Sequence, residues 1–477
     1  MSRLIIISNR VNPPDDASVG TAGGLAMALA AALREYSGIW FGWSGQKTES
    51  FTGQMSMQRV GGVTVALVDL EEQDVQEYYN GYANRTLWPL FHYRMDLAEY
   101  ERSFDEGYAR VNARFAETVL PLIEPDDLIW VQDYHLIPLA RELRRRGVAN
   151  RIGFFLHIPW PARRLITILP RHETLVEAML DYDLIGFQGA DSRDAFGDYI
   201  EHVAGGERVA SEGPITIVSL NGKQVRIGAF PIGIDAADFT KALESERSRD
   251  YFTRMVDSRA GRQMIVGVDR LDYSKGLEDR FLSYELLLSK NPDLLEKVFL
   301  LQVATPSRDE VAAYQEIRSK LDMVSGRING AFATVDWVPI RYVNHVYRRD
   351  ELSGIYRAAA IGLVTPHRDG MNLVAKEYVA AQDPDDPGVL VLSEFAGAAA
   401  QMGEALIVNP FSREEVSDAI RRGLTMPLSE RKRRWEILMH GVQEDDVEAW
   451  RDSFVKALEA TPRSGEAAPS EPRSMAG

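Results

Sequence analysis

The 477-residue chain contains no cysteine. Disulfides, thiolate metal ligands and thiol nucleophiles are therefore excluded, while the absence says nothing about the cellular compartment. The eight histidines do not show a metal-binding spacing such as H-E-x-x-H. A phosphate-binding P-loop and a G-x-S-x-G nucleophile elbow are also missing. The sequence therefore does not support catalysis by a thiol, an H-E-x-x-H zinc site, a P-loop nucleotide site or a hydrolase with a G-x-S-x-G elbow.

Long hydrophobic runs are missing as well. The run Leu4–Ile7 is too short for the core of a signal peptide, and no stretch approaches the roughly 18 apolar residues of a membrane span. The formal net charge of −16 argues against binding nucleic acid or an anionic membrane surface. It does not exclude small anionic substrates, because a local cluster of cations outweighs the distant charges at short range. We expect a cytoplasmic protein whose partners are small molecules.

The length exceeds what one hydrophobic core usually supports, so two domains are expected. Short apolar runs alternate with helical stretches, which predicts an α/β protein with doubly wound sheets. Several runs are continuously apolar, as in parallel strands covered on both faces. The pair Asn221-Gly222 predicts a hairpin between the runs 215–220 and 224–230. The other strands are expected at 4–7, 63–68, 128–131, 152–157, 184–187, 264–268, 299–303, 361–364, 389–392 and 406–408.

A Pro/Gly turn at 231–235 divides this pattern into two halves, 1–234 and 235–445. Two facing α/β domains form a cleft at the carboxyl ends of their strands, where ligands of such sheets bind. Residues 462–477 are rich in Pro, Ser, Ala, Gly and Glu, a composition typical of disorder.

The segment from His367 to Glu377 is the most informative part of the chain. It follows an expected strand and enters an expected helix, Leu373–Ala381, whose first N–H groups favour an anion. Asp369 precedes the helix and Glu377 lies about two turns later. Carboxylates on either side of a phosphate-binding helix start suggest a sugar-nucleotide site. In the alternative, Asp369 merely caps the helix and Glu377 is solvated.

Two more loops follow strands. The first strand leads to a polar loop and then to Gly23-Gly24, where a ligand could approach the backbone. This is not the G-x-G-x-x-G dinucleotide fingerprint, so a dehydrogenase is disfavoured. Arg270 and Lys275 follow the first strand of the second half and could neutralise a diphosphate and stabilise it as a leaving group. The alternatives are that Gly23-Gly24 forms only a tight turn and that Arg270 and Lys275 lie in a solvated basic loop.

Sugar-binding groups stand elsewhere along the chain. The segments Tyr78-Tyr79-Asn80 and Leu87-Trp88-Pro89 combine aromatic rings with hydroxyl and amide groups, although ordinary packing explains each aromatic alone. Asp133, His157 and Arg308 lie at the ends of expected strands, where α/β folds display functional side chains. A lone histidine there is more often structural. The acidic segments 181–183 and 383–386 resemble D-x-D metal motifs only superficially.

Together these motifs resemble the trehalose-6-phosphate synthase family, and they match it in order from residue 1 to about residue 455. The resemblance implies a retaining glycosyltransferase of the GT-B fold, with two Rossmann-like domains facing across a cleft and a helix over 446–461 that packs back on the first domain. It implies transfer of glucose from UDP-glucose to glucose 6-phosphate, no metal and no other cofactor, and a homo-oligomer, either tetramer or dimer. The motifs that carry it are Ser8-Asn9-Arg10, Gly23-Gly24-Leu25, Phe41-Gly42-Trp43, 77–80, 87–89, 91–93, 133–135, 155–159, 270–276 and 369–377.

The resemblance also implies a role for each matching residue. The acceptor, glucose 6-phosphate, would contact Arg10, Tyr79, Trp88, Asp133 and Arg308, with both arginines on its phosphate. The donor diphosphate would meet Gly23, Gly24, Arg270, Lys275 and the amides of Asn372, Leu373 and Val374. Glu377 would bind the ribose, Tyr347 would lie near the base, and Asp369 and His157 would hold hydroxyls of the transferred glucose. Trp160 departs conservatively from the phenylalanine frequent in bacterial relatives.

Retention could arise from double displacement, which needs a carboxylate nucleophile. Because Asp369 and Glu377 bind hydroxyls in this scheme, we favour transfer on one face of the sugar, with the diphosphate oxygen accepting the acceptor's proton. Arg270, Lys275, His157 and Asp369 are then the catalytic candidates. The alternatives are a synthase that uses glycerol 3-phosphate and a silent sugar-phosphate sensor. The sequence leaves open whether the donor carries UDP, GDP or ADP.

Overall fold

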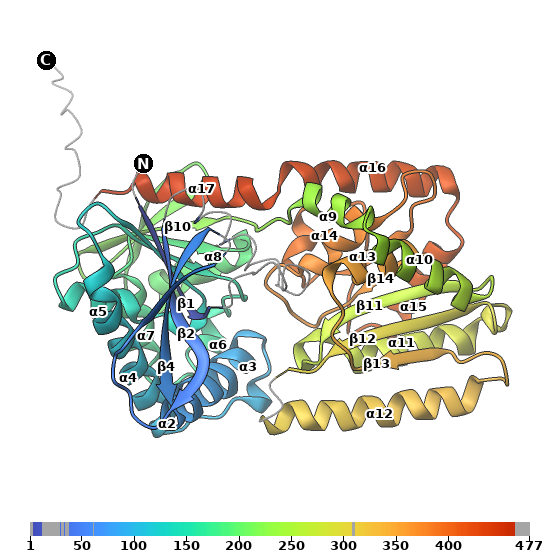
Figure 1. Cartoon of the computed structure of the whole chain (residues 1–477), viewed down its shortest axis with the longest axis horizontal. Helices are drawn as coiled ribbons and strands as arrows, with labels where there is room; N and C mark the ends of the chain where they lie inside the picture. The colour runs from blue at the N-terminus through green and yellow to red at the C-terminus, as the bar shows by residue number, and fades with distance from the viewer. Residues whose placement is uncertain are drawn as a thin grey trace, which may run out of the picture.

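The computed structural model describes residues 3–11, 29, 33, 38–60, 62–307 and 311–462. One sheet is built from residues 4–229 and a second from residues 263–408. They form the cores of the two lobes seen in Figure 1. Each sheet is flanked by helices, so the predicted α/β class with two doubly wound sheets is confirmed.

The first sheet has the strand order β3-β4-β2-β1-β5-β6-β7-β10-β9-β8. The strands from β4 to β10 run parallel, and the antiparallel strands β3, β9 and β8 lie at its edges. From β4 to β7 the order is the 3-2-1-4-5-6 pattern of dinucleotide-binding folds, which reverses between β1 and β5. Its strands are β1 (Leu4–Arg10), β2 (Ile39–Thr48), β3 (Ser56–Val60), β4 (Val63–Glu71), β5 (Leu128–Gln132), β6 (Ile152–Leu156), β7 (Leu184–Phe187), β8 (Glu207–Glu212), β9 (Ile215–Leu220) and β10 (Lys223–Ala229).

The second sheet has the order β13-β12-β11-β14-β15-β16, and all its strand pairs are parallel. It repeats the 3-2-1-4-5-6 pattern, with the reversal between β11 and β14. Its strands are β11 (Gln263–Arg270), β12 (Val298–Thr305), β13 (Ile340–Val343), β14 (Ile361–Val364), β15 (Val389–Ser393) and β16 (Leu406–Val408).

The continuous apolar runs are explained by burial on both faces of the sheets. In β1, Leu4 and Ile6 belong to one hydrophobic cluster, whereas Ile5 and Ile7 belong to another. Successive side chains of a strand point to opposite faces, so each face needs its own apolar residues. The predicted hairpin is also present, because Asn221 and Gly222 both adopt positive φ angles between β9 and β10.

Helices cover both faces of each sheet. A long π-helix, η1 (Val75–Leu87), runs directly into α3 (Trp88–Phe91). Such helices are rare and often mark functional sites. Besides several short 3-10 helices, the described residues form the α-helices α2 (Glu72–Asp74), α4 (Arg102–Val119), α5 (Leu139–Arg145), α6 (Arg163–Ile166), α7 (His172–Met179), α8 (Ala190–His202), α9 (Ala236–Leu243), α10 (Glu246–Arg259), α11 (Leu277–Lys290), α12 (Ala312–Phe332), α13 (Arg349–Arg357), α14 (Leu373–Ala381), α15 (Arg413–Leu424), α16 (Leu428–Glu444) and α17 (Val447–Glu459).

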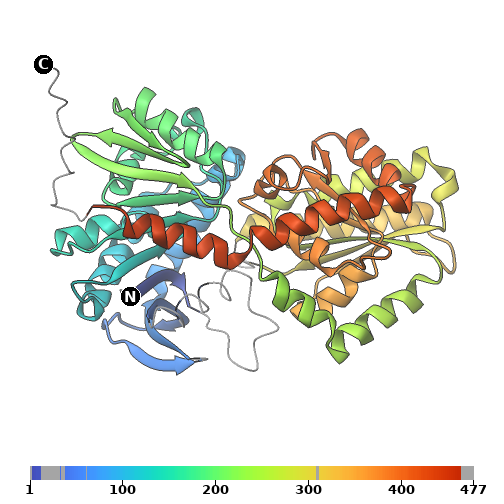
Figure 2. The ribbon, with the colours of Figure 1, turned by 90° about the horizontal axis from the view of Figure 1, so that it is seen from above.

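Helices α16 and α17 follow each other across the top of the molecule, α16 over the second lobe and α17 over the first (Figures 1 and 2). Phe454 of α17 stacks on Trp130 of the first sheet at 4.7 Å between ring centroids. Glycines in β6 and β7 make room for it, since a Cβ at Gly153 or Gly186 would lie 2.8 Å from its ring. The last helix is therefore part of the first sheet's cover.

Two chain segments run side by side between the lobes. The first, residues 230–235, leads from β10 to α9, and the second joins α16 to α17. The main-chain N–H of Val447 donates a hydrogen bond of 3.3 Å to the Ile234 carbonyl. A Cβ at Gly233 would overlap the carbonyl oxygen of Asp445. The lobes are thus joined by a paired connection, while the exact domain division stays a prediction. Among the described residues, no helix has the length and apolar character required to cross a bilayer.

Candidate active site

The candidate residues gather where the strand order of each sheet reverses. In the first sheet, Arg10 ends β1 and Asp133 follows β5. In the second sheet, Arg270 ends β11 and Asp369 lies in the loop after β14. Adjacent loops diverge at such a reversal, which leaves space for a ligand at the carboxyl ends of the strands. The two reversal points also approach each other in space, as the contacts described below show.

Asp369 and Lys275 form an ion pair between Oδ2 and Nζ. Both side chains are largely buried, at 13% and 10% exposed. Oδ1 of Asp369 accepts the Gly370 N–H at 2.9 Å, and Oδ2 also accepts from Nδ2 of Asn372 at 3.0 Å. Burial opposes the charged form of Asp369, but the Lys275 ammonium outweighs it and lowers the pKa of the carboxyl. Asp369 is therefore an anion held in place by its partners, and its carboxylate oxygens are hydrogen-bond acceptors.

Helix α14 begins beside this ion pair, with the bounds that the sequence predicted. Asn372 is its N-cap residue, with a φ of 68°, and the cap has no side-chain hydrogen bond. Asp369 therefore does not serve as the cap. The amides of Leu373 and Val374 lie in the first turn, where a helix leaves its N–H groups free for an anion. Glu377 is partly buried on the same helix, and burial raises the pKa of its carboxyl.

Arg270 lies at the contact between the lobes. Its guanidinium carbon is 5.1 Å from the ring centroid of Trp88, and its side chain is 45% exposed. Arg368 stands over the Tyr93 ring at 3.8 Å in the same way. Cations over aromatic faces thus join the second lobe to α3 and to the loop after it. One such contact places a predicted donor residue, Arg270, against a predicted acceptor residue, Trp88.

His157 touches both lobes through its backbone. Its N–H donates to Oδ1 of Asp133 at 3.1 Å, and its carbonyl lies so close to Gly370 that a Cβ there would overlap it. Asp133 itself has a φ of 71°, a strained conformation for a residue other than glycine. The His157 ring is engaged on both sides, by Gln132 at Nε2 and by Gln188 at Nδ1. Both ring nitrogens therefore have protein amide groups as partners, and the contact of His157 with a sugar hydroxyl stays a prediction.

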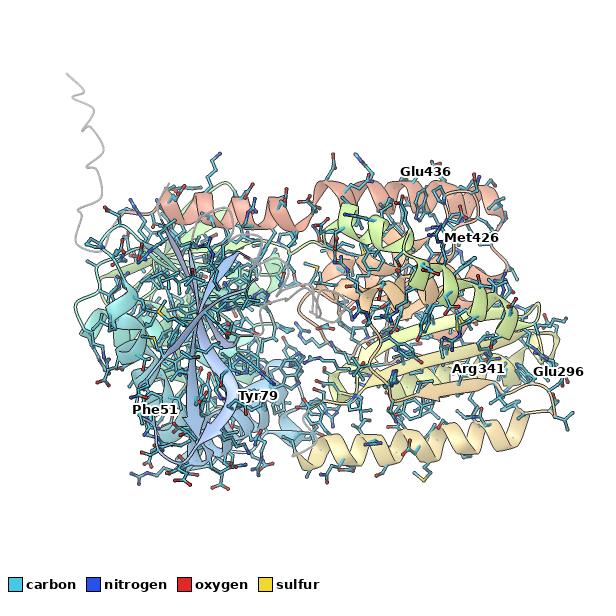
Figure 3. The ribbon with its side chains drawn as sticks, viewed as in Figure 1. Phe51, Tyr79, Glu296, Arg341, Met426 and Glu436 are labelled. Atoms are coloured by element: carbon cyan, nitrogen blue, oxygen red, sulfur yellow. The ribbon has the colours of Figure 1, made fainter. Side chains whose placement is uncertain are left out.

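The other acceptor candidates form an aromatic group in the first lobe. The Tyr79 ring, on η1, stacks on His135 at 5.9 Å and meets Trp43 edge-on at 5.6 Å. Arg10 is exposed, with its guanidinium 6.0 Å from the Trp43 ring. Figure 3 marks Tyr79 among the side chains of this lobe. An exposed cation beside aromatic faces suits a sugar phosphate.

The Tyr347 ring contacts Tyr251 at 6.0 Å and His345 at 4.9 Å between ring centroids. Three further candidates, Gly23, Gly24 and Arg308, lie outside the described residues.

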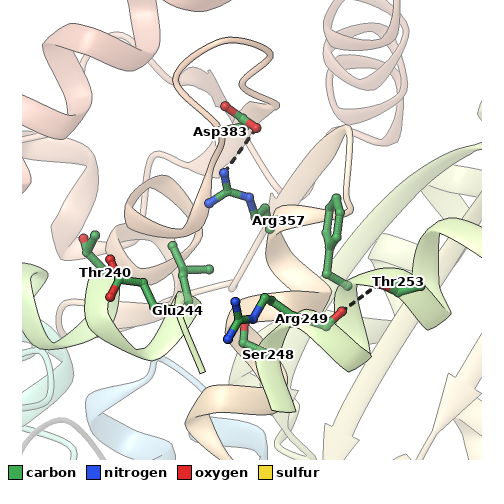
Figure 4. A pocket seen from close by; sticks show the side chains of 9 residues that line it. Thr240, Glu244, Ser248, Arg249, Thr253, Arg357 and Asp383 are labelled. Atoms are coloured by element: carbon green, nitrogen blue, oxygen red, sulfur yellow. Dashed lines mark hydrogen bonds and ion pairs between the residues drawn. The ribbon is translucent and has the colours of Figure 1, made fainter. Parts of the chain in front are cut away.

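A cavity of about 930 Å³ lies elsewhere, between α9, α10 and the segments around Arg357 and Asp383 (Figure 4). Arg357 shortly precedes β14, so this cavity is at the amino edge of the second sheet, opposite the Asp369 loop. Its Arg357 and Asp383 form an ion pair with each other at 3.2 Å. Strand topology and the Asp369 cluster therefore locate the candidate site better than cavity size does. In the described part of the chain, three or more potential metal ligands do not come together anywhere.

Several residues of this site were not given roles by sequence reasoning. Gln132 and Gln188 end or follow strands β5 and β7, which is the signal that could have found them. Tyr93 and Arg368 belong to recognised motifs, but nothing in the sequence pairs them. These residues hold the candidate groups in place from the neighbouring strands and from the opposite lobe.

The sequence model of glycosyltransferase family 20 matches residues 7–460. The chain belongs to glycosyltransferase family 20. A trehalose-6-phosphate synthase of Enterobacter sp. (strain 638) is 47% identical to this family-20 chain over 471 residues, which is 98% of the chain and 97% of that protein. A second one, of Sinorhizobium fredii, is 46% identical over 463 residues, or 97% of the chain and 99% of that protein.

Solved structures agree with this family assignment. An α,α-trehalose-phosphate synthase (UDP-forming) of Burkholderia xenovorans in complex with glucose-6-phosphate is 48% identical, with a TM-score of 0.90 over 96% of this chain and 100% of that one. A trehalose-6-phosphate protein of E. coli bound with UDP-2-fluoro glucose is 44% identical, with a TM-score of 0.91 over 97% of this chain and 100% of that one. The predicted GT-B fold is confirmed, and the chain is a glycosyltransferase.

Proposed function

We propose that this glycosyltransferase transfers glucose from UDP-glucose to glucose 6-phosphate, giving α,α-trehalose 6-phosphate and UDP. The observation that carries the proposal is the meeting of Arg270 with Trp88. It brings the cations of a diphosphate site, at the start of α14, against the aromatic residues of a sugar-phosphate site. The relatives described above, which span nearly the whole chain, are named for the same reaction.

In this proposal residues 235–445 bind the donor. Arg270 and Lys275 hold the diphosphate with the amides of Asn372, Leu373 and Val374, and Gly23 and Gly24 approach it from the first domain. Glu377 accepts hydrogen bonds from the ribose, and Tyr347 lies near the base. Asp369 accepts hydrogen bonds from hydroxyls of the transferred glucose. Its lowered pKa supports this role, because it stays an acceptor throughout the neutral range.

Residues 1–234 bind the acceptor, covered by the helix within 446–461. Arg10 and Arg308 hold its phosphate, and Tyr79, Trp88 and Asp133 surround its sugar ring. His157 lies between the two substrates. Its backbone contacts with Asp133 and Gly370 support a role in setting their separation. The alternative acceptor, glycerol 3-phosphate, is shorter and would leave part of the aromatic group around Tyr79 unfilled.

The transfer proceeds on one face of the donor sugar. As the bond between the anomeric carbon and the diphosphate oxygen breaks, negative charge develops on that oxygen. Arg270, Lys275 and the N-terminus of α14 stabilise this charge. The same oxygen takes the proton of the acceptor hydroxyl as the new bond forms to the anomeric carbon. Asp369 is neutralised by Lys275 and bonded to Asn372 and Gly370, an arrangement that suits binding better than nucleophilic attack.

The proposal also includes a reaction without metal, a homo-oligomeric assembly and a cytoplasmic location. EDTA in the assay tests the first, and light scattering of the purified protein tests the second. Fractionation of the cells that produce the protein tests the third.

The deciding experiment is an end-point assay with purified protein, UDP-glucose and glucose 6-phosphate, in the presence of EDTA. Mass spectrometry should detect UDP and a disaccharide monophosphate. Turnover with glycerol 3-phosphate instead would move the assignment to a glucosylglycerol-phosphate synthase. If neither acceptor gives a product with UDP-, GDP- or ADP-glucose, the result would favour the alternative of a catalytically silent sugar-phosphate sensor.

A further inference from the structure

Hydrogen bonds connect the segment between the lobes to the ring of His157. The main-chain N–H of Ile232 donates to Oε1 of Gln188 at 3.0 Å. Nε2 of Gln188 lies 3.2 Å from Nδ1 of His157, and Nε2 of His157 lies 2.9 Å from Oε1 of Gln132. We call this chain of contacts, from Ile232 through Gln188 and His157 to Gln132, the relay.

The direction of every hydrogen bond in the relay follows from its first member. A main-chain N–H can only donate, so the Gln188 atom that faces Ile232 is the amide oxygen. The atom facing His157 is then the NH₂ group, which also donates. Nδ1 of His157 must therefore accept and cannot carry a proton. The ring proton sits on Nε2 and is donated to Gln132, so His157 is a neutral imidazole in one tautomer.

Burial supports this assignment independently. Gln132 and Gln188 are 1% and 5% exposed. The His157 ring is partly buried against Phe155, at 4.6 Å, and Trp450, at 6.0 Å between centroids. Burial lowers the pKa of His157 to about 3.

Two charged groups lie close to the relay. The Asp133 carboxylate binds the main-chain N–H of His157, and the Lys376 ammonium lies at the far end, beyond Ile232. Neither contacts a ring nitrogen, so neither forms an ion pair that would stabilise a protonated imidazole.

The relay also reaches the proposed donor helix. Nζ of Lys376, on α14, donates to the Ile232 carbonyl at 3.1 Å. Ile232 therefore joins α14, whose start carries the proposed diphosphate site, to the residue that contacts both Asp133 and Gly370. A shift of the connecting segment would therefore displace Gln188 and, with it, the ring of His157.

We propose that Gln188 is a positioning residue that fixes the tautomer and orientation of His157 and ties both to the connection between the lobes. The proposal rests on the proposed function, because it takes His157 to lie between the two substrates. Gln188 does not touch substrate itself. It acts through His157, on whose backbone the separation of the Asp133 and Asp369 loops depends.

The first test is Gln188→Met, which keeps the length of the side chain and removes both hydrogen bonds. We expect kcat to fall about 10- to 100-fold, because small misplacements of reacting groups carry penalties of this order. The KM values for UDP-glucose and glucose 6-phosphate should change much less, since the groups that bind them are intact.

Gln188→Glu provides a second, nearly isosteric test. One carboxylate oxygen still accepts from Ile232, but the other now faces Nδ1 of His157 and requires a proton there. The pKa of His157 should rise into the range between pH 5 and pH 8. A plot of kcat against pH should then show an ionisation that the wild type lacks. Should Gln188→Met fail to fold, this profile decides alone.

Gln382→Met is the matched control. Gln382 is also a buried glutamine, 3% exposed, and it binds the carbonyls of Tyr356 and Tyr378 at 3.0 Å each. Neither of these hydrogen bonds involves a member of the relay. We expect a lower melting temperature, as for Gln188→Met, but an unchanged kcat and an unchanged pH profile.

Nitrogen-15 spectra of protein labelled in the histidine rings give a reading that does not need turnover. His157→Asn identifies the His157 signals, which should show a neutral ring protonated at Nε2 and should change in Gln188→Glu. A wild type without turnover but with these signals would overturn the proposed function and keep the relay. An active wild type whose kcat is unchanged in Gln188→Met and whose pH profile is unchanged in Gln188→Glu would overturn the relay.

Discussion

Lys376 offers a prediction whose magnitude follows from its surroundings. The residue is 1% exposed, and its ammonium donates a hydrogen bond to the Ile232 carbonyl. Burial lowers the pKa of Lys376 from 10.5 to about 8, against an opposing effect of Asp445. At about 1.4 kcal/mol for each pKa unit, keeping this lysine protonated in the folded protein costs about 3 kcal/mol.

The change Lys376→Met removes this penalty and keeps the volume of the side chain. It also leaves the Ile232 carbonyl without this donor, at a cost of about 1–3 kcal/mol. We therefore expect the variant to be up to about 2 kcal/mol more stable at pH 7. Differential scanning calorimetry of both proteins measures the difference.

The pH dependence of the stability difference between Lys376→Met and the wild type is the more stringent test. Below pH 8, Lys376 carries its proton in both the folded and the unfolded state, so the penalty is constant. Between pH 8 and 10.5 the folded state has released the proton while the unfolded state still binds it, so rising pH stabilises the wild type. The advantage of Lys376→Met should shrink across this window. A variant clearly less stable than wild type at pH 7, or a difference that does not change with pH, would refute the reasoning.

Three further predictions concern the site and the last helix. Arg270→Ala should lower kcat about 100- to 1,000-fold in steady-state assays of UDP release with little change in melting temperature, because the side chain is 45% exposed; a near-normal kcat would contradict its role. Gly186→Ala should cost about 1–3 kcal/mol in thermal melting, since its Cβ would lie 2.8 Å from Phe454, whereas the control Gly441→Ala on α16 meets no atom within 4 Å and should not destabilise. Burial raises the pKa of Glu377, so its carboxylate takes up a proton at a higher pH than an ordinary glutamate does. The affinity for UDP-glucose should therefore begin to weaken at that higher pH on acidification. Titration calorimetry should show that this pH dependence is lost in Glu377→Gln.

Much of the fold could be predicted because its signals are local. Buried parallel strands such as β14 need apolar residues on both faces, and these runs are visible in the sequence. Helix α14 was predicted with its observed bounds, Leu373–Ala381. Strand β8 was not predicted, because every residue of Glu207–Glu212 is exposed and no apolar pattern marks it. Strand β2 was missed because its apolar start runs into the polar end of Ile39–Thr48.

The candidate site was predictable to the same extent. Positions at strand ends, such as Asp133 and Arg270, follow from the strands themselves. The contact of Arg270 with Trp88 does not, because it depends on how two separately folded sheets are oriented. The relay was missed for a related reason. An uncharged amide such as Gln188 carries no signal until its neighbours on adjacent strands and on the connecting segment are known.

The return of α17 to the first lobe has a consequence for synthesis on the ribosome. Residues 447–459 emerge only after the whole second sheet has been made, yet Phe454 covers Trp130 and the glycines of β6 and β7. Until then the nascent first lobe exposes this apolar face to solvent. Its completion is thus delayed, so the order of folding differs from the order of synthesis. A chaperone that binds exposed aromatic surface would have its longest opportunity at this face.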